Sequence, residues 1–208
     1  QVGDLELGAN GYVFTEEPAL PPREVVVAHA QMMAAVAGDS EVLQALELGC
    51  VWGHGIDFDD WVGLGVLREV AERAADEAEA AGLAHPREGG VVFTSACREA
   101  ALISAERQAR IVAHHQRCAA RLADGTDRWR LGLHLLGTEA PEAFAVLREG
   151  AGQIRDTHST EHALQVVEVL RTAARSTEEW AYVAYVEGLL LMHRGRLDEA
   201  FEIGRAHV

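Results

Sequence analysis

The sequence predicts an all-α protein built from antiparallel helical hairpins. From Arg23 onward, apolar residues recur with the 3.6-residue period of a helix. About ten such stretches follow one another through short turns, which is typical of hairpins and of stacked repeats. Hydrophobic residues make up 49% of the chain but aromatic residues only 6%, and small Ala side chains favour closely packed helices over a β-sandwich.

The first half of the chain has clear start and stop signals. Residues 1–22 carry scattered Gly and Pro, so a linker, the tail of a preceding domain or a short hairpin is expected there. A helix over 23–37 starts after Pro22 and stops at Gly38. Asp39 or Ser40 caps the next helix, which has one buried stripe: Val42, Ala45, Leu46, Gly49 and Cys50.

Asp57 then caps a long helix over 58–81, which stops at Gly82. The segment that follows is ambiguous, because GGVVFT has strand character while CREAALI continues with a helical period. We expect a helix from Val91, and a further helix over 105–123 capped by Ser104.

The second half predicts four complete helices and the start of a fifth. The first of these helices starts at Asp127 and ends near Leu136, and the second starts at Thr138 with Pro141 and ends near Ile154. The third starts at Ser159 or Thr160 and ends near Arg175, and the fourth starts at Ser176 and ends near Arg194. Ser176 and Glu179 have capping-box spacing. Gly195 stops the fourth helix, and Leu197 begins the last one.

The charges exclude several functions. The net charge is −15, and all 18 basic residues are Arg. Without Lys, a P-loop lysine and a Schiff-base lysine are excluded, so no cofactor of those classes is expected. The acidic balance also argues against nucleic-acid binding in this segment.

Nothing in the sequence predicts a membrane protein or an exported one. No apolar run reaches the ~20 residues of a membrane span, and no signal peptide is visible. Three Cys without short spacings indicate reduced thiols and a cytoplasmic protein.

The segment 181–201, AYVAYVEGLLLMHRGRLDEAF, resembles the first two-thirds of a tetratricopeptide repeat. Gly188, Gly195, Leu197 and Ala200 stand at the signature positions of that motif. The resemblance implies that Gly188 and Ala200 lie where two helices cross, that Gly195 forms the turn and that Leu197 fills the space beneath it. Ala184 replaces the tryptophan of the motif.

Over 23–201 the chain is similar to the repeat region of large bacterial ATP-dependent transcriptional regulators of the MalT/LuxR type. The residues that carry this likeness run from Gly38-Asp39-Ser40 through QALELG to GVLREVAE. The resemblance implies a right-handed superhelix of tetratricopeptide-like hairpins over 23–201. The alternative is a plain bundle of helical hairpins.

The last seven residues, 202–208, read EIGRAHV, which looks like a translated sequencing adapter. We therefore expect this tail to be an artefact and the native chain to continue further. An array cut within a hairpin leaves an apolar face without its cap, so self-association is expected.

One motif points to an enzyme instead. His158, Glu161 and His162 match H-x-x-E-H, in which two His hold Zn²⁺ and the Glu serves as general base. Ser159 and Thr160 are natural caps, so a pair of solvated histidines at a helix start is the simpler interpretation.

Other candidate clusters are weaker still. His114, His115 and Cys118 lie close to Cys97 on the preceding predicted helix and suggest a metal site, although buried packing of Cys118 is favoured. Asp57, Asp59 and Asp60 begin like a calcium loop, which fails because Trp61 and Val62 follow. Gly63 and Gly65 lack the third Gly of a dinucleotide loop.

The sequence thus favours a non-enzymatic binding module. A superhelix presents a concave groove for a protein segment or a small inducer, and the acidic balance favours basic or amphipathic partners. In the regulators that the chain resembles, such an array receives the signal that controls an attached ATPase. A zinc-dependent hydrolase using His158, Glu161 and His162 is the alternative.

Overall fold

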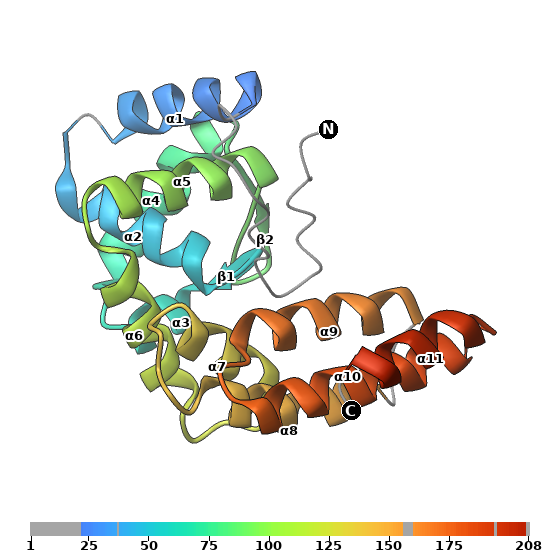
Figure 1. The fold of residues 1–208 in the computed structure, drawn as a ribbon. Coiled ribbons are helices and arrows are strands. Elements are labelled where there is room, and N and C mark those ends of the chain that lie inside the picture. Colours follow the sequence, from blue (N-terminus) through green and yellow to red (C-terminus); the bar gives the residue numbers. More distant parts are fainter. Residues whose placement is uncertain (1–21, 37, 156–159, 194, 207–208) are drawn as a thin grey trace. The chain divides into compact units, whose positions relative to one another are not determined.

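The computed structural model describes residues 22–36, 38–155, 160–193 and 195–206 (Figure 1). These residues are mostly helical (72%), but they also form a small antiparallel sheet of three strands. The expectation of an all-α fold is therefore corrected to a helical fold with a sheet. No repeat superhelix is shown in the described part of the chain. The segment predicted as a linker lies outside it, except for Pro22.

The chain divides into two compact units between Asp124 and Gly125, whereas the sequence predicted one helical domain over 23–201. Unit 1 comprises the described residues up to 124, and unit 2 those from 125. Unit 1 contains nine elements: α1 (Arg23–Ala35), α2 (Ser40–Trp52), β1 (Gly55–Asp57), α3 (Phe58–Gly63), α4 (Arg68–Ala80), β2 (Ala84–Arg87), β3 (Gly90–Phe93), α5 (Ser95–Arg107) and α6 (Ile111–Leu122).

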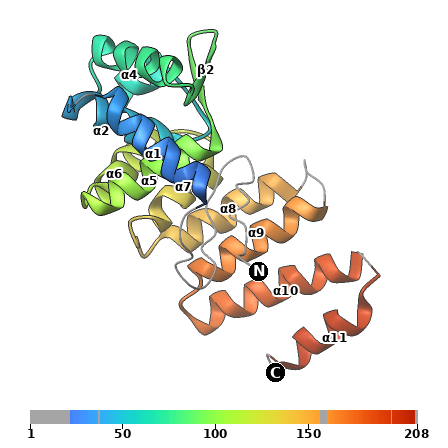
Figure 2. The same ribbon diagram turned by 90° about the horizontal axis from the view of Figure 1, so that it is seen from above.

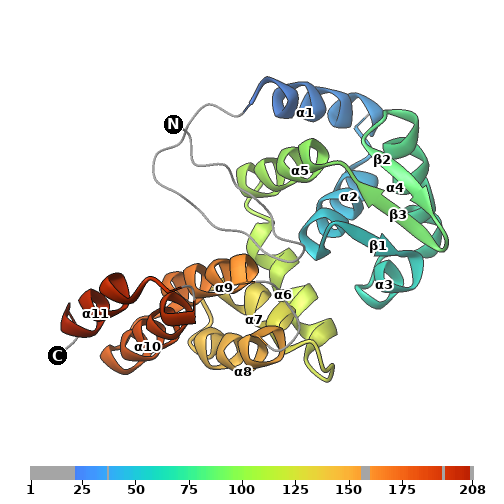
Figure 3. The same cartoon turned by 90° about the vertical axis from the view of Figure 1, so that its right-hand side faces the viewer.

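The sheet of unit 1 has the strand order β1-β3-β2 (Figure 3). β2 and β3 form a hairpin in which Arg87 pairs with Gly90 around a tight turn, with Gly89 at φ +77°. β1 pairs with the other edge of β3, with Ile56 opposite Val91. The expected helix start at Val91 is therefore wrong, and the strand character of GGVVFT prevails because the following helix begins only after its cap, Thr94.

The long helix predicted over 58–81 is two helices. α3 ends at Gly63, Gly65 adopts a left-handed φ of +82°, and α4 begins at Arg68. Because only Gly enters that region at little cost, Gly65 is the residue that permits the turn. The expected cap Asp57 makes no side-chain cap hydrogen bond, since its carboxylate pairs with Arg87 instead.

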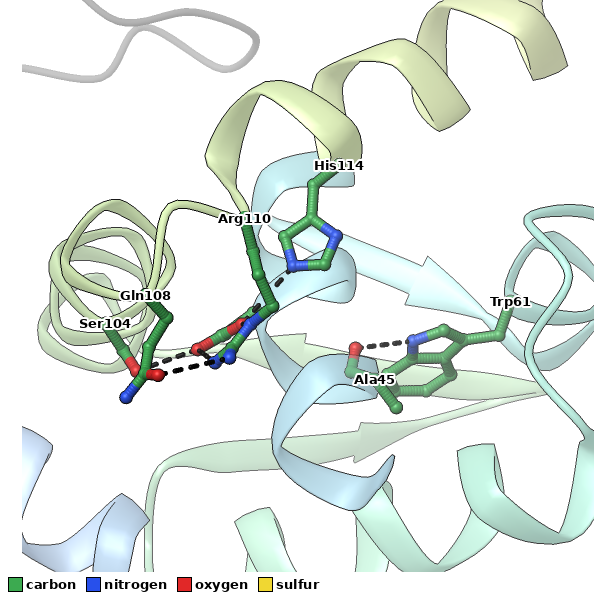
Figure 4. Close-up of polar contacts among 7 residues, drawn as sticks. Ala45, Trp61, Ser104, Gln108, Arg110 and His114 are labelled. Atoms are coloured by element: carbon green, nitrogen blue, oxygen red, sulfur yellow. Dashed lines mark hydrogen bonds and ion pairs between the residues drawn. The ribbon is translucent and has the colours of Figure 1, made fainter. Parts of the chain in front are cut away.

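α2 is the centre of the unit 1 core. It packs against α4, α5 and α6, and Asp39 caps it as predicted by accepting from two backbone amides. The predicted stripe is buried, but so is most of the rest of the helix. The Trp61 indole donates a 2.9 Å hydrogen bond to the Ala45 carbonyl, which ties α3 to α2 (Figure 4).

The predicted cap at Ser104 is also wrong. α5 runs through Ser104 to Arg107, Ala109 takes a left-handed φ of +56°, and α6 begins at Ile111. Ser104 is buried and uses its hydroxyl in a tertiary hydrogen bond described below.

The described residues of unit 2 form helices only. Its elements are α7 (Arg128–Leu136), α8 (Ala143–Arg155), α9 (Thr160–Ala173), α10 (Thr177–His193) and α11 (Leu197–Ala206). Each helix packs against the next one along the chain (Figure 2). Two predicted caps are confirmed: Asp127 accepts from the Arg130 amide, and Ser176 and Glu179 form the reciprocal capping box.

The closest helix contact of unit 2 depends on glycine. A Cβ on Gly150 of α8 would lie 2.4 Å from the backbone nitrogen of Trp129, and one on Gly132 of α7 would lie 2.7 Å from Leu147. These two positions let α7 and α8 approach each other where larger side chains would separate them. Gly188, the position predicted for such a crossing, lies instead where an added Cβ meets no described atom within 4 Å.

No helix among the described residues is long and apolar enough to cross a membrane.

Replacing Gly150 or Gly188 by Ala should change the free energy of unfolding in opposite directions. Gly150→Ala forces α7 and α8 apart and should lower the free energy of unfolding by about 1–3 kcal/mol. Gly188→Ala, also within a helix of unit 2, adds a methyl group to open space and should raise it by about 0.5–1 kcal/mol. Urea unfolding followed by circular dichroism measures both. Equal effects of the two substitutions would contradict the close contact.

Candidate functional site

A group of polar side chains in unit 1 surrounds Glu47 of α2, whose side chain is fully buried. Figure 4 draws the hydrogen bonds of Ser104, Arg110 and His114 as dashed lines. The Ser104 hydroxyl of α5 donates a 2.7 Å hydrogen bond to Oε1. Arg110, just before α6, donates from Nη2 to Oε1 at 2.7 Å and from Nε to Oε2 at 2.8 Å. His114 of α6 places Nε2 3.3 Å from Oε2. We call these four residues the Glu47 cluster.

The Glu47 cluster keeps its carboxylate ionised. Burial raises the pKa of Glu47, but the hydrogen bonds from His114, Arg110 and Ser104 outweigh it, so the pKa lies below its usual value. In return, the hydrogen bonds and charge of Glu47 raise the pKa of Arg110. The cluster is therefore a buried ion pair that joins three helices.

The geometry of the Glu47 cluster does not favour catalysis. Ser104 and His114 bind the same carboxylate from different sides, whereas an activated serine needs its own hydrogen bond to the histidine. Both carboxylate oxygens are already occupied by donors, and Glu47 is closed to solvent. The arrangement can hold α2, α5 and α6 together, but it leaves no position for a substrate.

His115, the neighbour of His114, is buried as a neutral side chain. Desolvation, followed by the adjacent His114, lowers the pKa of His115 to about 4. The folded state favours the neutral form of His115, because burial destabilises the charged imidazolium ion.

The proposed zinc motif stays a prediction. His158 lies outside the described residues, and the described backbone of α9 includes Glu161 and His162 but not the placement of their side chains. Among the described residues, no group of three or more His, Cys, Asp or Glu is placed to hold a metal ion. That finding covers His114, His115, Cys118 and Cys97, of which His114 faces Glu47.

The three aspartates that resemble the start of a calcium loop each pair with a different arginine. Asp57 pairs with Arg87 at 2.6 Å, and Asp59 pairs with Arg68 at 3.1 Å. Asp60 lies 3.6 Å from Arg121. Because each carboxylate faces its own cation, the three do not converge on a common site.

The four residues of the repeat signature lie in different environments. Gly195 has φ +72° and lies in the turn before α11. Leu197 is 50% exposed and therefore does not fill a buried space. Ala200 is half-buried on α11, and Gly188 faces open space on α10.

The break between α3 and α4 is a feature that the sequence did not predict. The two helices are joined by the four-residue segment 64–67, which contains Gly65, and a short connection with Gly is typical of a helix-turn-helix motif. β1 precedes α3, and the β2–β3 hairpin follows α4 with β3 in the middle of the sheet. Gly65 and Gly89, which both have positive φ, were the signals in the sequence for these two turns.

The exposed face of α4 is acidic. Its outward residues are Arg68, Glu69, Glu72, Arg73, Asp76 and Glu77. Arg68 is paired with Asp59 and Glu72, and Arg73 with Asp39. Glu69, Asp76 and Glu77 take part in no ion pair among the described residues, so the face carries net negative charge. We call Glu69, Asp76 and Glu77 the α4 acidic face.

Two large apolar side chains border the turn before α4. Val62 is 47% exposed at the end of α3, and Leu67 is 64% exposed immediately before α4. Apolar groups beside carboxylates are a combination that suits a cationic, amphipathic surface.

A pocket of about 320 Å³ lies elsewhere on unit 1, between α1 and the chain around Leu83 and Thr94. Val27, Ala28 and Leu83 contribute its apolar lining, and Arg23 and Glu24 add one charge of each sign. Its size is at the lower end for small-molecule sites. Its lining contains no pairing of a nucleophile with a base.

Comparisons with known protein families, with characterised proteins and with solved structures find no significant match to this chain.

The neutral His115 predicts that unit 1 loses stability in mild acid. The folded-state pKa of about 4 lies below the ordinary 6.5, so the unfolded state binds the proton first. Stability is complete above pH 6.5 and falls by up to about 3 kcal/mol as the pH drops to 4. His115→Gln should remove this dependence between pH 6.5 and 4, as measured by urea unfolding at several pH values. His85→Gln, at an exposed position, should retain it, and loss of the slope in both variants would refute the assignment.

Proposed function

We propose that the chain is a non-enzymatic module that binds proteins. In this proposal, unit 1 uses its helix-turn-helix to bind a basic, amphipathic protein segment instead of DNA. The observation that supports it most is the α4 acidic face, which occupies the helix that reads the major groove in DNA-binding helix-turn-helix proteins.

The charges on this helix oppose DNA binding. A recognition helix contacts bases and phosphates largely through Arg and Lys. α4 has two outward Arg, each held by carboxylates, and Arg87 of the β2–β3 hairpin is held by Asp57. Three carboxylates on the exposed face of α4 remain without an ion pair among the described residues and would repel phosphates.

The same surface is suited to a protein partner. The α4 acidic face attracts Arg or Lys side chains, and Val62 and Leu67 offer apolar contact at the adjoining turn. A cationic amphipathic helix carries both kinds of matching group, basic side chains and apolar side chains, on one segment. The charge complementarity would act mainly on association rate and on the choice of partner.

The wider role follows from the family resemblance. We propose that the chain is a regulatory, signal-receiving segment of a larger bacterial transcriptional regulator, with the helices of unit 2 as the beginning of a repeat array. Any ATPase chemistry would belong to another part of that protein, because this segment has no Lys for a P-loop.

Three labelled probes test the proposal by fluorescence anisotropy: a 20-residue amphipathic Leu/Arg peptide, a matched Leu/Glu peptide and a 30-base-pair DNA duplex. The chain should bind the Leu/Arg peptide with a micromolar Kd at 50 mM NaCl and several-fold more weakly at 200 mM, since salt screens the attraction. The other two probes should not bind.

Variants locate the binding surface. Neutralising the α4 acidic face with Glu69→Gln, Asp76→Asn and Glu77→Gln should weaken peptide binding about tenfold. A control with Glu24→Gln, Glu106→Gln and Asp124→Asn removes the same charge from exposed positions outside α4 and should change the Kd less than twofold. Tight, salt-dependent binding of the duplex, or equal losses in both triple variants, would overturn the proposal.

A further inference from the structure

The pocket beside α1 is formed by three helices of unit 1. Along α1, Glu24, Val27, Ala28 and Gln31 line it at spacings i, i+3, i+4 and i+7, so one stripe of the helix makes one wall. α1 lies along α5 (Figure 3). The remaining lining residues are Arg23 at the start of α1, Gly82 and Leu83 after α4, and Thr94 and Ala96 at the start of α5.

The middle of this pocket is apolar. Val27 and Ala28 lie between Glu24 and Gln31, which are about 10 Å apart along the helix axis. Ala28 and Leu83 belong to the buried core of unit 1, whereas Val27 is 47% exposed. The pocket therefore offers apolar surface that is still in contact with water. An aliphatic side chain that covers this surface gains free energy from the hydrophobic effect.

Two opposite charges line the pocket at the start of α1. Arg23 and Glu24 are consecutive residues, and consecutive side chains of a helix do not face each other. Neither takes part in an ion pair among the described residues. By contrast, five other arginines of unit 1 each face a carboxylate: Arg68, Arg73, Arg87, Arg110 and Arg121. The charges of Arg23 and Glu24 are thus both available to a bound molecule.

We propose that this pocket binds a free α-amino acid with an aliphatic side chain, such as leucine. The carboxylate of the amino acid pairs with Arg23, and its ammonium group pairs with Glu24. Its side chain covers Val27, Ala28 and Leu83. The volume of about 320 Å³ is at the lower end for small-molecule sites, which suits a ligand of this size.

The pair of charges favours a zwitterion over other small ligands. A ligand with one charge would displace water from both Arg23 and Glu24 and replace it at only one of them. An uncharged apolar ligand would displace water from both and replace it at neither. A zwitterion provides a partner for each charge, and its side chain provides the apolar contact.

We expect the site to be weak and to stabilise unit 1. The pocket is open to water on the side of Val27, so few groups of the ligand are enclosed, and a Kd of about 0.1–1 mM is expected. A bound amino acid would connect α1 to the end of α4 and the start of α5, and it would favour the folded state by linkage. This inference goes beyond the proposed function and does not rest on the α4 acidic face.

Ligands that differ by one group test the proposal, with Kd measured from the backbone amide shifts of α1 in NMR titrations. Leucine should bind. 4-Methylpentanoate lacks the ammonium group and 3-methylbutan-1-amine lacks the carboxylate, so each should bind about tenfold more weakly. Glycine lacks the side chain and should not bind measurably. No binding of leucine at about 20 mM, or equal affinities for leucine and both analogues, would overturn the proposal.

Variants assign each charge to one group of the ligand. Arg23→Gln should weaken leucine binding about tenfold but should not weaken binding of 3-methylbutan-1-amine, which has no carboxylate. Glu24→Gln should likewise weaken leucine binding but not that of 4-methylpentanoate, which has no ammonium group.

Matched controls exclude a general effect of charge. Arg107→Gln and Glu106→Gln remove the same charges from exposed positions outside the pocket and should change the Kd for leucine less than twofold. Arg23 and Glu24 are exposed as well, so all four variants should fold, which circular dichroism verifies. Equal losses in pocket and control variants, or an Arg23→Gln variant that loses the amine as strongly as leucine, would refute the assignment.

Discussion

The architecture of unit 1 depends on one buried carboxylate. Glu47 lies in the middle of the central helix α2 and has no access to solvent. A charge in that position is tolerable only when it is paired and fully hydrogen-bonded, and removing one partner from such a pair typically costs about 3–5 kcal/mol. Ser104, Arg110 and His114 supply the donors, so α5, the turn after it and α6 are held to α2. The position of these helices also limits where the remaining face of α2 can pack against α4.

The sequence predicts the helix caps, which are local contacts, but not the sheet or the long-range contacts of Glu47. Asp39, Asp127 and the Ser176–Glu179 capping box bond to backbone within a few residues, so their spacing predicts them correctly. Strands of three or four residues contain too few positions for a period to appear, and the sheet was therefore missed. Glu47 looks like a surface residue in sequence, because the partners that justify its burial lie 57 to 67 positions away.

The same limit explains the outcome for the candidate sites. Gly63 and Gly65 were considered for a dinucleotide loop, but Gly63 is the last residue of α3 and Gly65 lies in the turn between α3 and α4. This turn was missed because the helical period of 58–63 continues in the sequence into 68–80. We propose that the acidic helix α4 serves protein contacts, because its carboxylates disfavour contact with DNA.

The proposed role of α4 is tested most directly by NMR, with backbone amide shifts recorded during titration. A cationic amphipathic peptide and a DNA duplex are added separately to the isotope-labelled chain at low salt. The account predicts that the peptide shifts amides of α4 and of the turn around Leu67, while the duplex leaves them unchanged. Shifts in α4 produced by the duplex, or peptide-induced shifts confined to other surfaces, would contradict it.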